Sequence, residues 1–275
     1  MKKSIIILIS PILVFGLIGL TSCNSSSSKK VKPKEAVELQ KVDTIKKAII
    51  KNVYPLPTSA QVIKMLTDME VGYQIGVTNS PDNVKKYYNS KAKAVAVGVY
   101  GADLSYVTLY NIMQEVTTYM DVLKGLANEL NLGQVYKPAL YDSIKANFDN
   151  KDKLVSILTN AFNETYSYMT DNDQQTLALL VVGGGWIEGM YLTCLVNEAA
   201  YQDARFSKVL LDQKKSFELY LDLTKPYIDD PNIKEMIKNM EPIKKVYQGL
   251  GTSMTLSNIK DISKAINTVR EKIVQ

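Results

Sequence analysis

The sequence predicts an all-α protein, a multi-helix bundle arranged around one glycine-rich central helix. Apolar residues recur at three- and four-residue steps along most of the chain, which is the helical period. No stretch shows the sustained two-residue alternation, bounded by turn residues, that strands show. The segment 177–200, LALLVVGGGWIEGMYLTCLVNEAA, is apolar on all sides, as is typical of a helix in the middle of a bundle. Short connections between the expected helices favour antiparallel neighbours.

Residues 1–22 have the architecture of a secretory signal peptide. Lys2 and Lys3 precede an apolar run at 5–20, and the sequence Leu-Thr-Ser-Cys follows at 20–23. This sequence resembles the lipobox of bacterial lipoproteins, in which the chain is cut before the cysteine and the cysteine receives acyl chains such as palmitate. The resemblance implies lipidation at Cys23 and attachment to the membrane through the N-terminal lipid. The alternative is an uncleaved N-terminal helix.

Residues 23–34 are predicted to be a tether rich in Ser and Lys, and residues 35–275 a single helical domain. The lipoprotein resemblance also bears on location. Asn24, rather than Asp, follows the cysteine, which favours the outer membrane. No acidic tract follows Cys23, which favours the periplasmic face over the cell surface.

In the first part of the domain we expect a helix within residues 31–52 and then an extended stretch fixed by Pro55 and Pro57. A helix capped by Thr58 or Ser59 then runs to about residue 69. Residues 71–80 read as a loop. Proline at position 81 favours a helix start there, with the helix continuing to about residue 97.

Gly98 and Gly101 are expected to break that helix, and Asp103 to cap a new one that runs to residue 132 and stops at Gly133. A strand at 93–100, KAVAVGVY, is the alternative for the preceding stretch. Asp171 is expected to cap the glycine-rich helix. The remaining predicted helices occupy residues 137–148, 150–169, 205–224, 231–250 (two short pieces) and 257–275.

The apolar helix at 177–200 is either a membrane span or a buried core helix. Its length is sufficient to cross a bilayer. However, Glu188 lies near its middle, where a lone carboxylate costs about 2–3 kcal/mol on insertion. Its flanks are acidic and lack basic or aromatic anchors. The sequence therefore favours a buried core helix.

Three consecutive glycines, Gly183, Gly184 and Gly185, lie inside this helix, although each costs about 1 kcal/mol relative to Ala. Close approach of a neighbouring helix is the favoured explanation. A kink or local unwinding that frees backbone groups for a ligand is the alternative. Neither dinucleotide-binding nor P-loop spacing is present around the glycines.

Two segments share a pattern of acid, tyrosine and threonine: 103–108 (DLSYVT) and 188–193 (EGMYLT). Asp103 with Tyr106, and Glu188 with Tyr191, are three residues apart and share a helix face, so each hydroxyl can approach its acid. The repetition is compatible with two similar helical halves or with chance similarity. In the functional interpretation both acids face an interior cavity and bind a ligand or cation, or act in acid–base chemistry. In the structural interpretation Asp103 is an N-cap and Glu188 bonds a backbone group near the glycines.

Composition excludes several kinds of site. The chain has no histidine, and Cys194 is the only cysteine besides Cys23. We therefore assign no catalytic residue, metal site or cofactor. A net charge of +5 with only two arginines argues against a nucleic-acid partner.

The segments 54–58 (YPLPT), 99–106 (VYGADLSY) and 184–188 (GGWIE) resemble an uncharacterised group of helical lipoproteins of Bacteroidota. The group has no established activity, so the resemblance implies helicity and compartment only. We expect a non-enzymatic binding or structural module with an envelope protein or a small ligand as its partner. The alternative is a carboxylate-based hydrolase or lyase, or a small-ligand or cation-binding protein, that uses Asp103 and Glu188.

Overall fold

The structure, a computed structural model, describes residues 59–195 and 200–274. The expected signal peptide, Cys23, the tether and the helix within 31–52 lie outside the described residues. The described residues form ten α-helices and three short 3-10 helices and no strand, so the prediction of an all-α bundle is confirmed.

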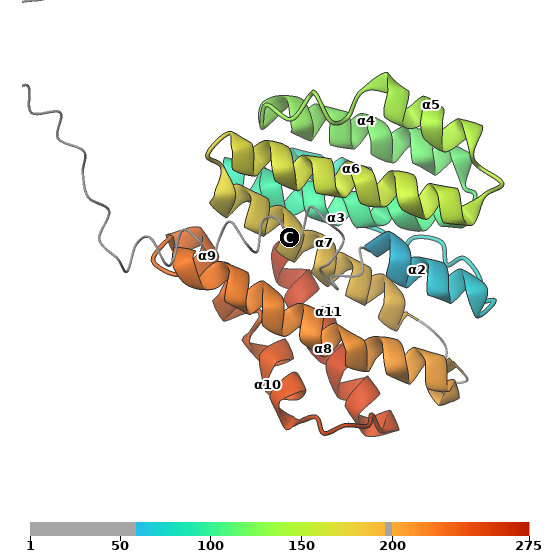
Figure 1. The fold of residues 1–275 in the computed structure, drawn as a ribbon, viewed down its shortest axis with the longest axis vertical. Helices are drawn as coiled ribbons and strands as arrows, with labels where there is room; N and C mark the ends of the chain where they lie inside the picture. Colours follow the sequence, from blue (N-terminus) through green and yellow to red (C-terminus); the bar gives the residue numbers. More distant parts are fainter. Residues whose placement is uncertain (1–58, 196–199, 275) are drawn as a thin grey trace, which may run out of the picture.

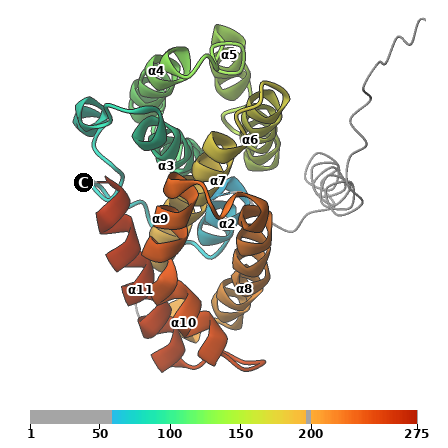
Figure 2. The same cartoon turned by 90° about the vertical axis from the view of Figure 1, so that its left-hand side faces the viewer.

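In chain order the helices are α2 (Ser59–Asp68), η1 (Pro81–Lys86), α3 (Ser90–Leu109), α4 (Met113–Glu129), α5 (Pro138–Ala146), α6 (Lys151–Asp171), α7 (Gln175–Cys194), η2 (Ala200–Gln202), α8 (Ala204–Thr224), η3 (Lys225–Tyr227), α9 (Pro231–Asn239), α10 (Glu241–Gly249) and α11 (Leu256–Val274). Helices α3 to α6 form one side of the molecule and α8 to α11 the other, with α7 between them and α2 beside α7 (Figures 1 and 2).

Helix α7 is the centre of this arrangement. It makes its most extensive contact with α3 and also packs against α2, α6, α9 and α11. Within the described part of the chain, α7 alone is long and apolar enough to cross a membrane, yet 89% of its apolar window is buried inside the protein. The other helices of the chain therefore cover this apolar surface, as the core-helix prediction requires.

Most predicted helices match the structure to within a few residues, but three predictions around α3 are wrong. Gly98 and Gly101 do not break the chain, because α3 runs through both. Asp103 is therefore an interior residue of a helix and caps nothing. Residues 93–100 are helical, so the strand alternative is also wrong. The helix persists because α7 packs against it at Gly98, and this packing outweighs the low helix propensity of glycine.

Helix ends also differ from prediction. The expected helix at 103–132 is divided between α3 and α4, which are joined through Asn111 at φ 62°. Helix α4 ends before Asn131, at φ 61°, rather than at Gly133. The helix expected at 80–97 is divided into η1 and α3, and Asn89 caps α3. Asp171 ends α6 instead of capping α7. Asparagine tolerates the left-handed conformation, so it can end a helix where glycine was expected to do so.

Candidate functional site

The site begins at the contact between α3 and α7, where glycines let two backbones meet. A Cβ atom at Gly98 would overlap the carbonyl oxygen of Val181 and lie 2.5 Å from the backbone nitrogen of Gly185. A Cβ atom at Gly184 would overlap the carbonyl oxygen of Val95. This is the close approach favoured for the glycines. Gly183 instead faces the Tyr220 hydroxyl, at 2.5 Å from its Cβ position.

Glu188 lies in α7 just beyond this contact, and its side chain is fully buried. Arg270 from α11 binds the carboxylate with two hydrogen bonds. Its Nε donates to Oε2 and its Nη2 to Oε1, both at 2.9 Å. The arginine side chain is itself only 14% exposed. A bidentate pair of this kind fixes geometry as well as charge. The structural interpretation of Glu188 as a partner of a freed backbone group is therefore wrong.

Asp103 lies in α3 next to Glu188, and its side chain is also fully buried. Its Oδ2 accepts a hydrogen bond of 3.2 Å from the backbone nitrogen of Asn79. Its Oδ1 has no protein donor. The Asp103 and Glu188 carboxyls are close enough to share a hydrogen bond. The structure thus brings together the two acids that the sequence paired.

The two carboxyl groups differ in charge. Burial raises the pKa of Asp103 well above its ordinary value, and the neighbouring Glu188 charge raises it further. Burial also raises the pKa of Glu188, but the Arg270 guanidinium opposes that rise. Because the guanidinium stabilises the Glu188 anion directly, Asp103 is the protonated member of the pair. In this arrangement the neutral Asp103 carboxyl donates a hydrogen bond to the Glu188 carboxylate, and the carboxylate is paired with Arg270.

The two predicted tyrosines are near the cluster but make other contacts. The Tyr106 hydroxyl accepts a hydrogen bond of 2.9 Å from the backbone nitrogen of Gln74. The Tyr191 ring lies 4.0 Å from the Arg270 guanidinium carbon, in a cation–π contact. The expected contact of each hydroxyl with its own acid is replaced by a loop contact in one case and an arginine contact in the other.

The loop at residues 77–80 covers the acid pair. Asn79, which is 2% exposed, donates from its side chain to the Tyr87 hydroxyl at 2.9 Å. Its carbonyl accepts from the Tyr119 hydroxyl at 3.1 Å, and Tyr100 donates to the Ser80 carbonyl at 2.9 Å. Three tyrosines from the linker before α3, from α3 itself and from α4 therefore hold the loop in place. Both carboxyl groups are fully buried beneath it.

Arg270 and Asn79 also belong to the site, although neither is predicted from the sequence motifs. Arg270 is one of two arginines in the chain, and it lies beside the apolar stripe of the last helix, next to buried Val269. An arginine at the edge of a buried stripe needs an anionic partner. That signal indicates a buried acidic partner without identifying which acid it is. Asn79 carried no comparable signal, because its backbone rather than its side chain contacts Asp103.

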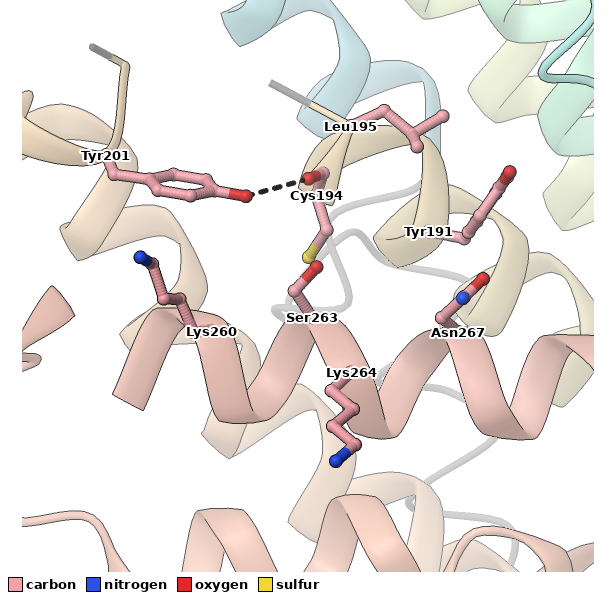
Figure 3. A pocket seen from close by; sticks show the side chains of 8 residues that line it. All are labelled: Tyr191, Cys194, Leu195, Tyr201, Lys260, Ser263, Lys264 and Asn267. Atoms are coloured by element: carbon pink, nitrogen blue, oxygen red, sulfur yellow. Dashed lines mark hydrogen bonds between the residues drawn. The ribbon is translucent and has the colours of Figure 1, made fainter. Parts of the chain in front are cut away.

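A separate pocket of about 530 Å³ lies one helical turn from the cluster, between the C-terminal end of α7 and α11. Figure 3 shows the Ser263 hydroxyl next to the Cys194 sulfur, and Lys264 pointing to the opposite side of α11 from Ser263. The Tyr201 hydroxyl donates to the Cys194 carbonyl at 3.4 Å. The lining residues are Tyr191, Cys194, Leu195, Tyr201, Lys260, Ser263, Lys264 and Asn267.

The pocket and the acid cluster meet only at Tyr191. This residue lines the pocket and also stacks on Arg270. Burial raises the pKa of the Cys194 thiol to about 12, so the buried thiol is protonated at neutral pH and reacts slowly. Among the described residues, no group of three or more potential metal ligands lies together.

Comparisons of the chain with models of protein families, with curated proteins and with solved structures find no match.

Proposed function

We propose that this chain is a lipid-anchored envelope protein that acts as a non-enzymatic binding module, with a small polar ligand held in the pocket between α7 and α11. The observation that carries the proposal is the pocket itself. Its volume of about 530 Å³ falls within the range of ligand sites in proteins. Tyrosine, lysine, serine and asparagine side chains line it, which supports a polar ligand with hydrogen-bonding groups.

The accessibility of the acids weighs against the alternative of a carboxylate-based hydrolase or lyase. A general acid or base must come within hydrogen-bond reach of its substrate. Asp103 and Glu188 are both fully buried, and Arg270 occupies both oxygens of Glu188. The same arrangement leaves no free charge for a cation. A structural role for the cluster and a binding role for the pocket fit these observations together.

The pocket can be tested by ligand-observed saturation-transfer NMR on the full chain in detergent, with amino acids, mono- and disaccharides and small carboxylic acids as probes. Asn267→Trp would fill the pocket from an exposed position of α11, and Lys272→Trp, also exposed on α11, is the matched control. At least one probe class should bind the unmodified protein and Lys272→Trp but not Asn267→Trp. Binding of no probe, or equal binding to Asn267→Trp, would overturn the assignment of the pocket.

The anchor rests on the lipobox resemblance of residues 20–23 and on the resemblance to helical lipoproteins of Bacteroidota. The periplasmic face of the outer membrane is the location that the residues after Cys23 favour. Cells that produce the full chain should incorporate an alkyne analogue of palmitate into it and carry it in the membrane fraction. Cys23→Ala should lose both properties. Continued labelling of Cys23→Ala would contradict lipidation at this residue.

A further inference from the structure

The buried cluster contains two acids but one cation. Arg270 uses Nε and Nη2 on Glu188, whereas Asp103 receives one backbone N–H on Oδ2 and has no protein donor on Oδ1. If both carboxyls were ionised, one buried negative charge would have no partner, which proteins avoid. A single proton on Asp103 balances the charge of the cluster. It also lets Oδ1 of Asp103 donate a hydrogen bond to Glu188.

The cluster also joins α7 and α11, the two helices that form the walls of the pocket. On α7, Glu188 precedes the pocket residue Tyr191 by about one turn, and on α11, Arg270 follows the pocket residue Asn267 by about one turn. The Glu188–Arg270 ion pair therefore joins the two walls just beyond the end of the pocket. The Tyr191 ring, stacked on the guanidinium, continues this connection into the pocket lining.

We propose that Asp103, Glu188 and Arg270 form a proton-dependent clamp that holds α11 against α7 and thereby controls access to the pocket between them. This role as a regulator rests on the proposed function, because it presumes that the pocket binds a ligand. The three residues are positioning residues in this scheme, since none of them lines the pocket.

The clamp is closed when the pair of acids holds one proton. Removal of that proton at high pH places two negative charges beside one guanidinium, and their repulsion favours entry of water and loosening of α11. Addition of a second proton at low pH neutralises Glu188 and leaves the buried Arg270 without a counter-ion. Both changes weaken the connection between α7 and α11, so the pocket opens at either extreme.

The other titratable groups around the two acids keep the same charge while the acids gain or lose a proton. Burial raises the pKa of each neighbouring tyrosine, so these side chains stay neutral while the acids titrate. Arg270 remains charged throughout. The facing groups are Arg270 from α11, Tyr191 from α7, Tyr100 from α3, Tyr119 from α4, and Tyr87 from the linker before α3; Glu271 of α11 acts on Tyr191.

Labelling of the buried Cys194 thiol reports on the contact between α7 and α11. Cys194 belongs to α7, lines the pocket and hydrogen-bonds to Ser263 of α11. The test is the rate of N-ethylmaleimide labelling of Cys194 in the full chain in detergent, located by peptide mapping to separate it from Cys23. Glu218→Gln, which removes an exposed acid from α8 outside the cluster, is the matched control. Each labelling rate is divided by the rate of this control at the same pH, which removes the effect of thiol ionisation on the rate.

At neutral pH, Glu188→Gln should label about tenfold faster than Glu218→Gln, because a glutamine amide has one acceptor oxygen and cannot accept both hydrogen bonds by which Arg270 joins α11 to α7. Asp103→Asn keeps a hydrogen-bond donor toward Glu188 but cannot ionise. It should match the unmodified protein near pH 7, and the unmodified protein should label about threefold faster than Asp103→Asn by about pH 10. A constant ratio between these two proteins across the pH range would overturn the clamp.

The Asp103→Asn comparison decides the question by itself if circular dichroism shows that Glu188→Gln does not fold. Equal labelling of a folded Glu188→Gln and the control would also overturn the proposal. The labelling experiment contains no ligand, so its outcome is independent of the small-molecule test of the pocket. A working clamp with no bound probe would contradict the proposed function alone, and a bound probe without pH-dependent labelling would contradict the clamp alone.

Discussion

Two stretches of the chain, α3–α6 (the first half below) and α7–α11 (the second half), each begin with a long apolar helix that carries the same motif, but the acid of each motif has different partners. The segments 103–108 and 188–193 both place a buried acid, a tyrosine and a buried threonine at equal spacing. In the second half, Arg270 from the last helix pairs with Glu188. In the first half, Asp103 receives only a backbone N–H from Asn79 and lies against Glu188.

This difference shows that a repeated helix motif does not determine the electrostatics of its acid. The charge partner comes from a distant helix, and one half supplies a single cation to a cluster that contains both acids. Asp103, which has no cation of its own, is neutralised by a proton instead of by an ion pair. Two positions that look equivalent in the sequence therefore hold a carboxylate in one helix and a neutral acid in the other.

Arg270→Ala should produce the largest loss, because it removes the only cation of the cluster and leaves Glu188 buried without a charge partner. The free energy of unfolding should fall by about 3–5 kcal/mol. Urea denaturation followed by circular dichroism measures this loss. Lys272→Ala, which changes an exposed residue of the same helix, should stay within about 0.5 kcal/mol. A fall in the free energy of unfolding of less than about 1 kcal/mol in Arg270→Ala would mean that the ion pair with Arg270 is not what separates Glu188 from Asp103.

The all-α fold, the central position of α7 and most helix positions could be predicted from apolar periodicity, because burial of an apolar face is recorded locally in the sequence. The pairing of Asp103 with Glu188 could also be proposed, from the repeated spacing. The ends of α3 and α4 could not be placed, because Asn111 ends α3 inside a stretch predicted to be one helix and Asn131 ends α4 ahead of Gly133, both in the left-handed conformation.

The electrostatics of the site lay beyond sequence reasoning for a different reason. Arg270 is separated from Glu188 by 82 residues, and no local pattern connects them. The sequence around Gly98 predicts a helix break, because the contact of Gly98 with Val181 and Gly185 depends on a helix that begins more than 70 residues later. Tertiary packing overrides propensity at both positions.

Gly98→Ala should separate the two central helices and so weaken the contact between the halves. The added methyl group would overlap the Val181 carbonyl, and backbone atoms cannot move aside as a flexible side chain can. We expect a loss of about 1–3 kcal/mol in the free energy of unfolding. Gly101→Ala is the control in the same helix, because nothing lies within 4 Å of its Cβ position. It should stabilise the protein by about 0.5–1 kcal/mol, so equal effects of the two changes would contradict the close contact.

Asp103→Asn should change the pH dependence of stability. The folded pKa of Asp103 is raised above its unfolded value, so the folded protein binds the proton more tightly. The free energy of unfolding of the unmodified protein should therefore fall as pH rises from about 4, by about 1.4 kcal/mol per pH unit relative to Asp103→Asn, until the folded pKa is passed. Chemical denaturation at several pH values measures the difference. Parallel curves for the two proteins would show that Asp103 is ionised in the folded state.

The smallest expected difference lies between the tyrosines of the two motifs. Tyr106→Phe removes the acceptor for the Gln74 backbone nitrogen from a residue that is 3% exposed, and should cost about 1 kcal/mol. Tyr191→Phe keeps an aromatic ring beneath the Arg270 guanidinium, and should change the free energy of unfolding by less than about 0.5 kcal/mol. The same denaturation assay resolves the two. Equal losses would mean that the Tyr191 hydroxyl, and not only its ring, contributes to stability. The two tyrosines would then contribute equally, although the two acids beside them have different partners.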